Sequence, residues 1–225
     1  MIDPLQYKEN LTMPKLVVDA TGDEFFMPDD DHYWWGMLPG ETYRLMIANA
    51  EHSMATGLLP LVTGVVPFVT SVLHDTARPV FDWSMDATTG AITVDLKTKP
   101  TRAVMWSATT DSIDNGRRDF RLIKGDTEHD PCEFIKVSIF GTACVNPVLW
   151  APEDLEIVET GSGTYQVVAT QDMPPEGHWR GFLAYFYFPG PAEGQTFLMT
   201  TQVSIIPHTF PFPMCNGTEC KGFLV

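Results

Sequence analysis

The residues best suited to chemistry are an aspartate and a histidine, each of which follows a short apolar segment. Asp23 comes after the predicted strand Lys15–Asp19, and His52 comes after the predicted strand Tyr43–Ala48. A carboxylate that orients an imidazole turns the imidazole into a general base able to activate a hydroxyl nucleophile. The spacing therefore predicts that Asp23 is the acid and His52 the base of a catalytic triad.

The order of these parts along the chain is typical of the α/β-hydrolase fold, in which the nucleophile precedes the acid and the acid precedes the base. Only 22 residues precede Asp23, and no serine of the chain lies in a Gly-x-Ser-x-Gly motif. We interpret the sequence as the back half of a catalytic apparatus, with Asp29 as the alternative acid. Without a nucleophile, these residues cannot perform acyl transfer.

The elements that position this pair are predicted from local patterns. The apolar run Leu16–Val18 suits a parallel strand buried on both faces, and Gly22 permits the tight turn after it. A crossover helix over Asp30–Leu38 is expected between the two strands. Trp34 and Trp35 are adjacent and cannot share one helix face, so one is expected to pack on the sheet and the other to line a pocket.

Three consecutive acidic residues precede the expected helix. Asp29, Asp30 and Asp31 suit an N-terminal cap and complement the helix dipole, and a calcium site is the alternative. Neither the composition nor the spacing of other residues predicts a metal or a cofactor.

An apolar stretch after His52, residues 53–75, approaches the length of a membrane span. Gly57, Pro60, Gly64 and Pro67 interrupt it, and no basic cluster flanks it. We therefore predict a buried helix that closes the sheet and is broken or kinked near Pro60 and Pro67, and no membrane span. Residues 1–79 are expected to be the C-terminal part of an α/β-hydrolase domain.

Short strands with turns between them dominate the rest of the chain. Residues 80–210 are predicted to form an immunoglobulin- or fibronectin-like β-sandwich, and residues 211–225 a Pro-rich tail closed by a disulfide. The expected fold class is thus α/β plus all-β. The expected strands are Val80–Met85, Ala91–Leu96, Arg102–Ala108, Asp119–Lys124, Leu155–Glu159, Tyr165–Ala169, Trp179–Phe188 and Thr196–Ile206.

The cysteines fall into two local pairs, Cys132 with Cys144 and Cys215 with Cys220. Neither pair has the spacing of a zinc site, so disulfides and an oxidising compartment are predicted. Two sequons, at Asn10 and Asn216, are compatible with glycosylation in a secretory pathway. The N-terminal residues do not have the pattern of a signal peptide, which suggests a missing front end.

The net charge of −15 argues against nucleic acid and anionic membranes as partners, because both would repel the chain. An unpaired parallel edge at Lys15–Asp19 invites association. We therefore expect either a partner chain, such as a missing N-terminal hydrolase half, or self-association.

Several long motifs resemble the PhoPQ-activated pathogenicity-related protein family, which also contains secreted autocrine proliferation repressors of social amoebae. The resemblance covers essentially the whole chain. It is carried by IDPLQY, MPKLVVDATGDEFFMPD, WW, LPG, NAEHS, WSATT, GRRDFRLIKG, NPVLW and PHTFPFPMCNGTECKGFLV.

The resemblance implies a secreted protein in which an α/β-hydrolase domain is followed by a β-rich region. In that family a Gly-x-Ser-Lys-Arg-Gly elbow precedes the region equivalent to residue 1, and this sequence has no such elbow. The expected function is the C-terminal portion of a serine hydrolase or peptidase acting on peptides or esters, inactive alone. The alternative is a non-catalytic secreted signalling or binding protein that acts through its β-sandwich.

Overall fold

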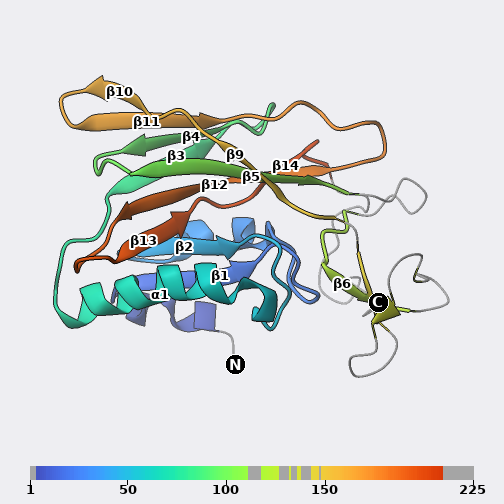
Figure 1. Cartoon of the computed structure of the whole chain (residues 1–225), viewed down its shortest axis with the longest axis horizontal. Helices are drawn as coiled ribbons and strands as arrows, with labels where there is room; N and C mark the ends of the chain where they lie inside the picture. Colours follow the sequence, from blue (N-terminus) through green and yellow to red (C-terminus); the bar gives the residue numbers. More distant parts are fainter. Residues whose placement is uncertain are drawn as a thin grey trace.

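In the described residues β-strands make up most of the regular secondary structure, as Figure 1 shows. The fold is a computed structural model that describes residues 4–110, 118–126, 132, 136–137, 143–146 and 148–209. Mixed and antiparallel sheets dominate it, so the expected β-rich character is confirmed.

The largest sheet combines strands from both ends of the chain. β1 and β2 are parallel and in register from Lys15 with Thr42 to Ala20 with Ile47, as predicted. β2 then pairs antiparallel with β13. In spatial order the strands are β1 (Lys15–Ala20), β2 (Thr42–Ile47), β13 (Thr196–Thr200), β12 (Arg180–Pro189), β5 (Arg102–Thr109) and β9 (Ala151–Asp154), with β14 (Ser204–Ile206) also paired to β12.

A second, antiparallel sheet lies over one face of the main sheet. Its strands are β10 (Val158–Gly161), β11 (Thr164–Ala169), β4 (Ile92–Leu96) and β3 (Phe81–Met85). A third small sheet contains β6 (Ile123–Gly125), β8 (Ala143–Val145) and β7 (Lys136–Val137). Cys144 of β8 forms a disulfide with Cys132, so this predicted pairing is confirmed.

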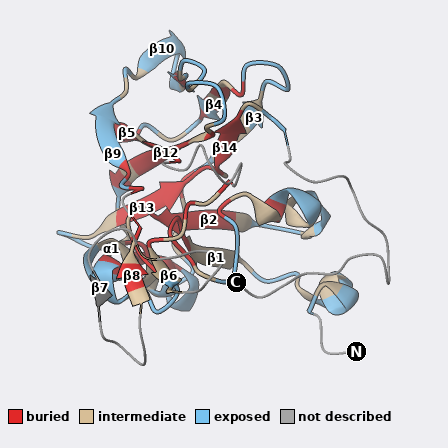
Figure 2. Cartoon of the chain, turned by 90° about the vertical axis from the view of Figure 1, so that its right-hand side faces the viewer, coloured by how far each residue is buried: buried red, intermediate tan, exposed pale blue. Residues whose placement is uncertain are grey.

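The period of two along β12 builds two cores at once, because successive side chains of a strand point to opposite faces. Phe182, Ala184, Phe186 and Phe188 pack between the main and second sheets. Leu183 and its alternate neighbours face the other way. Figure 2 shows β2, β12 and β13 buried at the centre of the molecule and β10 exposed at its rim.

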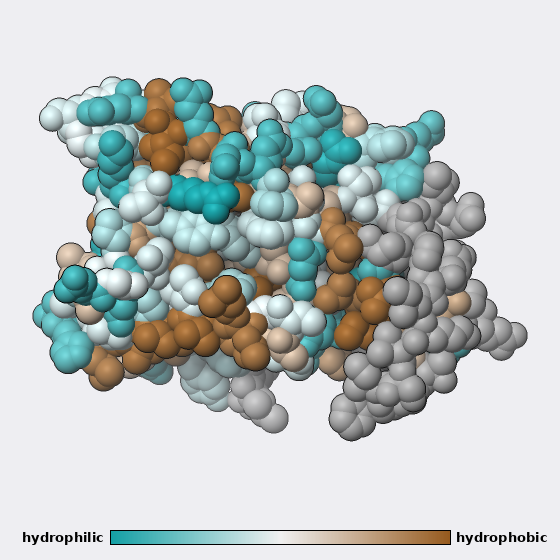
Figure 3. Space-filling model, viewed as in Figure 1, coloured by the Kyte–Doolittle hydropathy of each residue, from teal (hydrophilic) through white to brown (hydrophobic). Residues whose placement is uncertain are grey.

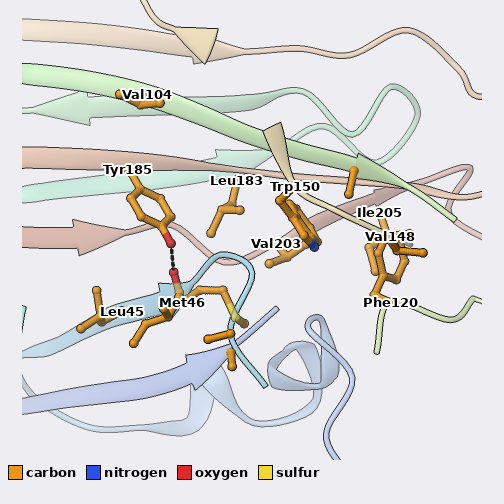
Figure 4. Close-up of a cluster of buried hydrophobic side chains, with 14 of the residues drawn as sticks. Leu45, Met46, Val104, Phe120, Val148, Trp150, Leu183, Tyr185, Val203 and Ile205 are labelled. Carbon is orange, nitrogen blue, oxygen red and sulfur yellow. Dashed lines mark hydrogen bonds between the residues drawn. The ribbon is translucent and has the colours of Figure 1, made fainter. Parts of the chain in front are cut away.

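In the core on the Leu183 side of β12, the Tyr185 hydroxyl joins distant parts of the chain. The Tyr185 hydroxyl donates to the Met46 carbonyl at 2.6 Å and accepts from the Ala48 N–H at 2.6 Å. Figure 4 shows the first of these bonds among the packed side chains of β2, β12 and the segment around Trp150. The strand that precedes His52 is therefore fixed from the C-terminal part of the chain.

The helices differ from the expectation in two places. The segment predicted as one helix over Asp30–Leu38 forms two 3-10 helices, Asp30–Tyr33 and Trp35–Met37, separated by the non-helical Trp34. Asp31, in the first of these helices, contacts Arg44 of β2 and Gln202 in the segment after β13. Further 3-10 helices span Pro4–Asn10 and Ala55–Gly57.

The helix after His52, α1 (Leu58–Leu73), is present but neither broken nor fully buried. Pro60 lies in the first turn, where a missing N–H leaves no bond unmade, and the helix also continues through Pro67. Only Gly64, Pro67, Phe68 and Ser71 are buried. The prediction of a buried closing helix was therefore wrong for its outer side.

The predicted strands recur with shifted bounds. The expected strand Asp119–Lys124 forms only over Ile123–Gly125. The expected strand Leu155–Glu159 overlaps only the first two residues of β10, and β9 ends just before it. The division of the chain at residue 79 stays a prediction, although both parts contribute strands to the main sheet.

Candidate active site

The loops that carry Asp23 and His52 both follow the carboxyl ends of strands β1 and β2 of the main sheet. β1 and β2 are adjacent and parallel, and Ala20 is level with Ile47. The first loop is then bonded to the second, because the Thr21 N–H donates to the Ile47 carbonyl at 3.0 Å. Carboxyl ends of neighbouring parallel strands are where functional loops of open α/β sheets gather.

Asp23 and His52 are hydrogen-bonded to each other, as their position after the two strands predicts. The Nδ1 atom of His52 lies 2.9 Å from the Oδ2 atom of Asp23. The other carboxylate oxygen, Oδ1, accepts the N–H groups of Phe25 at 2.7 Å and Phe26 at 3.1 Å. Asp23 is thus buried and held through both oxygens, whereas the His52 side chain is 49% exposed.

This pairing favours the charged imidazolium. The hydrogen bond that the His52 ring donates to the Asp23 carboxylate is the largest cause that raises the pKa of His52 above 6.5, and the Asp23, Glu24 and Asp19 charges add to it. A raised histidine pKa stabilises the fold fully below pH 6.5, and that stabilisation is lost as the pH rises through the raised value. With Nδ1 facing the carboxylate, Nε2 is on the opposite side of the ring.

The His52 loop is also held by two carboxylates, one from the Asp23 loop and one of its own. The His52 N–H donates to the Glu24 carboxylate at 2.8 Å. Glu51 accepts hydrogen bonds from the Ser53 hydroxyl and from the Ala55 N–H. Partial burial opposes ionisation of Glu51, but these bonds and that of Thr56 lower its pKa to about 2. Glu51 therefore stays ionised and caps the turn that follows His52.

Asn49 ties the same loop to a segment 101 residues away. Its backbone is left-handed, with a φ of 58°, a conformation that asparagine tolerates better than most residues. Its side-chain amide donates to the Trp150 carbonyl at 2.8 Å and accepts the Trp150 N–H at 2.7 Å. Only a group with both a donor and an acceptor makes this pair of bonds.

The Asp23 loop is held by close contacts between the backbone of Gly22 and the backbones of Leu122 and Ala50. The Gly22 carbonyl accepts the Leu122 N–H at 2.9 Å, and the Gly22 N–H donates to the Ala50 carbonyl at 3.0 Å. A Cβ on Gly22 would lie 2.6 Å from the Leu122 Cβ, a distance that a side chain does not tolerate. Gly22 is therefore required by this contact, and not only by the turn.

Two aromatic rings flank His52 that the sequence analysis did not assign to the site. The Phe25 ring lies 4.6 Å from the imidazole in an edge arrangement, and the Phe26 ring lies 6.1 Å from it. Both phenylalanines are largely exposed. Phe25 and Phe26 lie two and three residues after Asp23, on the turn that its carboxylate caps. This position in the sequence could have indicated that they lie near His52.

The two tryptophans predicted near the site lie around a different residue. Arg44 is fully buried and contacts the rings of Trp34 and Trp35 at 5.9 and 6.0 Å, while Trp35 also packs on Trp83. A pocket role for these rings stays a prediction. The alternative acid, Asp29, is bound to Arg118 at 2.6 Å.

The buried Arg44 side chain forms ion pairs with two aspartates. It bonds Asp19 at 3.3 Å and Asp31 at 3.0 Å. Burial raises the pKa of both carboxyls, and Arg44 opposes that shift. Burial and then the neighbouring Asp19 and Asp31 charges raise the pKa of Asp30 to about 6. The described residues contain no cluster of three or more His, Cys, Asp or Glu arranged to hold a metal.

The remaining predicted sites are partly outside the described residues. Asn10 is exposed at the end of the first 3-10 helix. Cys215, Cys220 and Asn216 lie outside the described residues.

The sequence model of the family described as PhoPQ-activated pathogenicity-related protein matches residues 1–121, which is just over half of the chain. The autocrine proliferation repressor protein A of Dictyostelium discoideum is 30% identical over 235 residues, covering 99% of this chain and 44% of the relative. The chain thus spans less than half the length of the curated relative it matches. No solved structure matches it. The chain belongs to the PhoPQ-activated pathogenicity-related protein family.

Proposed function

We propose that this chain is the acid- and base-bearing portion of a secreted serine hydrolase of the peptidase or esterase type. In this reading residues 1–79 are the end of an α/β-hydrolase domain, and an immunoglobulin-like sandwich follows. The observation that carries the proposal is the 2.9 Å contact between Asp23 and His52 at the carboxyl ends of two parallel strands. That contact orients the imidazole with Nε2 available to a hydroxyl nucleophile.

The proposed roles follow from burial and charge. Asp23 keeps the proton on Nδ1 of His52 and stabilises the imidazolium that forms when Nε2 accepts a proton from a serine hydroxyl. The serine is supplied from outside this chain. Phe25 and Phe26 leave an apolar surface next to the imidazole, which suits the side chain or acyl group of a peptide or ester. No cofactor is required.

An experiment that supplies the serine tests the proposal. The part of the Dictyostelium repressor that this chain does not match is expressed separately, mixed with this chain, and labelled with a fluorophosphonate probe. We expect labelling that depends on this chain, is abolished by His52→Ala, and falls about 10⁴-fold in rate with Asp23→Asn, since the wrong tautomer then faces the serine. His74→Ala, at the end of α1, is the matched control and should label normally.

Labelling that survives His52→Ala would contradict the proposal. The second candidate is a non-catalytic secreted signalling or binding protein. The name of the relative, autocrine proliferation repressor protein A, favours it. In that case Asp23→Asn and His52→Ala would leave repression of cell proliferation unchanged.

Secretion is part of the same proposal. The Cys132–Cys144 disulfide suits an oxidising compartment, and the exposed Asn10 is accessible to glycosylation. Protein recovered from the medium of secreting cells should lose mass on treatment with an N-glycosidase, and Asn10→Gln should remove part of that change.

A further inference from the structure

The backbone of His52 is hydrogen-bonded to a second acidic residue of the Asp23 loop. The His52 N–H donates to the Oε2 atom of Glu24 at 2.8 Å. Glu24 directly follows Asp23, whose own carboxylate lies 2.9 Å from Nδ1 of the same histidine. Two consecutive acidic residues therefore hold His52 at two points, one on its ring and one on its backbone.

The turn after β1 places the Glu24 side chain for this contact. The Oδ1 atom of Asp23 accepts the N–H groups of Phe25 and Phe26 at 2.7 and 3.1 Å, which is the way aspartate caps a turn. Glu24 lies between the two ends of these bonds, so its backbone is fixed by them. From this position its carboxylate bridges to a residue 28 positions further along the chain.

The bond to Asp23 does not fix the imidazole by itself. The ring is joined to the His52 backbone through rotatable bonds, so a shift of the backbone also moves Nε2. The His52 side chain is 49% exposed, and packing therefore restrains it only in part. A misplacement of about 1 Å in a reacting group can cost about 10²-fold in rate. The position of the His52 backbone thus matters for a base as much as the orientation of the ring.

Other side chains of the same loop hold other parts of it. Glu51 bonds the turn that follows His52, and Asn49 bonds Trp150. Glu24 differs from both because it comes from the opposite loop and contacts the histidine itself. It links the loop of the acid directly to the backbone of the base.

Glu24 also acts through its charge. The hydrogen bond to Asp23 is the main cause of the raised pKa of His52, and the negative charge of Glu24 adds to it. The accepted hydrogen bond and the charge are separable contributions, because glutamine keeps a side-chain oxygen and loses the charge. Salt should weaken the contribution of the charge, since Glu24 is only half-buried.

We propose that Glu24 is a positioning residue for the His52 base, which holds the His52 backbone while Asp23 holds the ring. The inference rests on the proposed function, because a base is positioned only for a reaction. The bond lies near the surface, where water competes with it. Its loss should therefore have a moderate effect, far smaller than the loss of the Asp23 carboxylate.

The first test uses this chain alone and the variants Glu24→Ala and Glu24→Gln. We expect Glu24→Ala to speed hydrogen exchange of the His52 amide about 10-fold, and Glu24→Gln to change it much less. The pKa of His52 should fall in both variants, by less than in Asp23→Asn. In Glu24→Gln the fall should shrink at high salt. Urea unfolding shows that each variant is folded under these conditions.

Asp86→Ala is the matched control. Asp86 is exposed, and its carboxylate also accepts backbone N–H groups, in the turn between β3 and β4 of the second sheet. Its removal should leave the exchange of the His52 amide and the pKa of His52 unchanged.

The second test is the rate of fluorophosphonate labelling in the mixture with the unmatched part of the Dictyostelium repressor. Glu24→Ala should slow labelling about 10-fold, and Glu24→Gln should restore most of the rate. Asp86→Ala should label at the natural rate.

Three results would overturn the inference: unchanged exchange of the His52 amide in Glu24→Ala, the same fast exchange in Glu24→Gln, or equal effects of Asp86→Ala. Labelling of the natural sequence that Glu24→Ala leaves at full rate would also overturn it, and would keep the proposed function. Exchange and titration as expected, with no labelling of the natural sequence, would remove the proposed function and leave Glu24 as the residue that holds the His52 backbone.

Discussion

The loops of Asp23 and His52 and the helix α1 are neighbours in the sequence, but they differ in how fully this chain provides their partners. The two loops are held by bonds to Leu122 and Trp150 as well as to each other. The outer side of α1 has no such cover in the described residues. The comparison indicates that the contacts that hold Asp23 and His52 together lie within the described residues, whereas the outer side of α1 is exposed there (Figure 3).

Removing the buried cation beneath the loops should have the largest effect on stability. Arg44→Met leaves Asp19 and Asp31 without their partner, and breaking a buried ion pair from one side costs about 3–5 kcal/mol. Protonated carboxyls do not need the cation, so the loss should be greatest at pH 7 and smaller toward pH 4. Urea unfolding at several pH values measures this, and a pH-independent loss would contradict it.

A pair of leucines on the two sides of α1 sharpens the comparison directly. Leu45 is fully buried and lies under Gly64 of the helix, so Leu45→Ala should cost about 2–5 kcal/mol. Leu59 is exposed on the outer side of α1, and Leu59→Ala should change the free energy of unfolding by about 0.5 kcal/mol or less. Equal losses in urea unfolding of the chain alone would show that α1 is covered on both sides.

The amide of Asn49 should have a smaller effect on stability and a specific effect on His52. Asn49→Gly keeps the left-handed backbone at low cost and removes only the two bonds to Trp150. We expect a loss of about 1–3 kcal/mol and a fall of the His52 pKa toward 6.5, because the loop no longer holds the ring against Asp23. Unchanged His52 titration with reduced stability would make Asn49 a purely structural residue.

Local patterns were enough to predict that Asp23 and His52 lie side by side, because the carboxyl ends of two adjacent parallel strands are fixed by the strands themselves. Local patterns also predicted α1, but the apolar composition of the helix did not show which of its sides would be exposed. The Trp34 ring contacts Arg44 of β2, and the bond between Asn49 and Trp150 joins residues 101 positions apart. Such contacts arise only after the sheets assemble, and no period in the sequence records them.

The most direct test of the account is the titration of His52 by NMR in this chain and in its Asp23→Asn variant. We expect a His52 pKa above 6.5 in the natural sequence, because Asp23 holds the charged ring, and a clear fall of that pKa in the variant. A His52 pKa that is the same with and without the Asp23 carboxylate would show that the two residues do not act as a pair. It would also remove the basis for assigning a catalytic site to this chain.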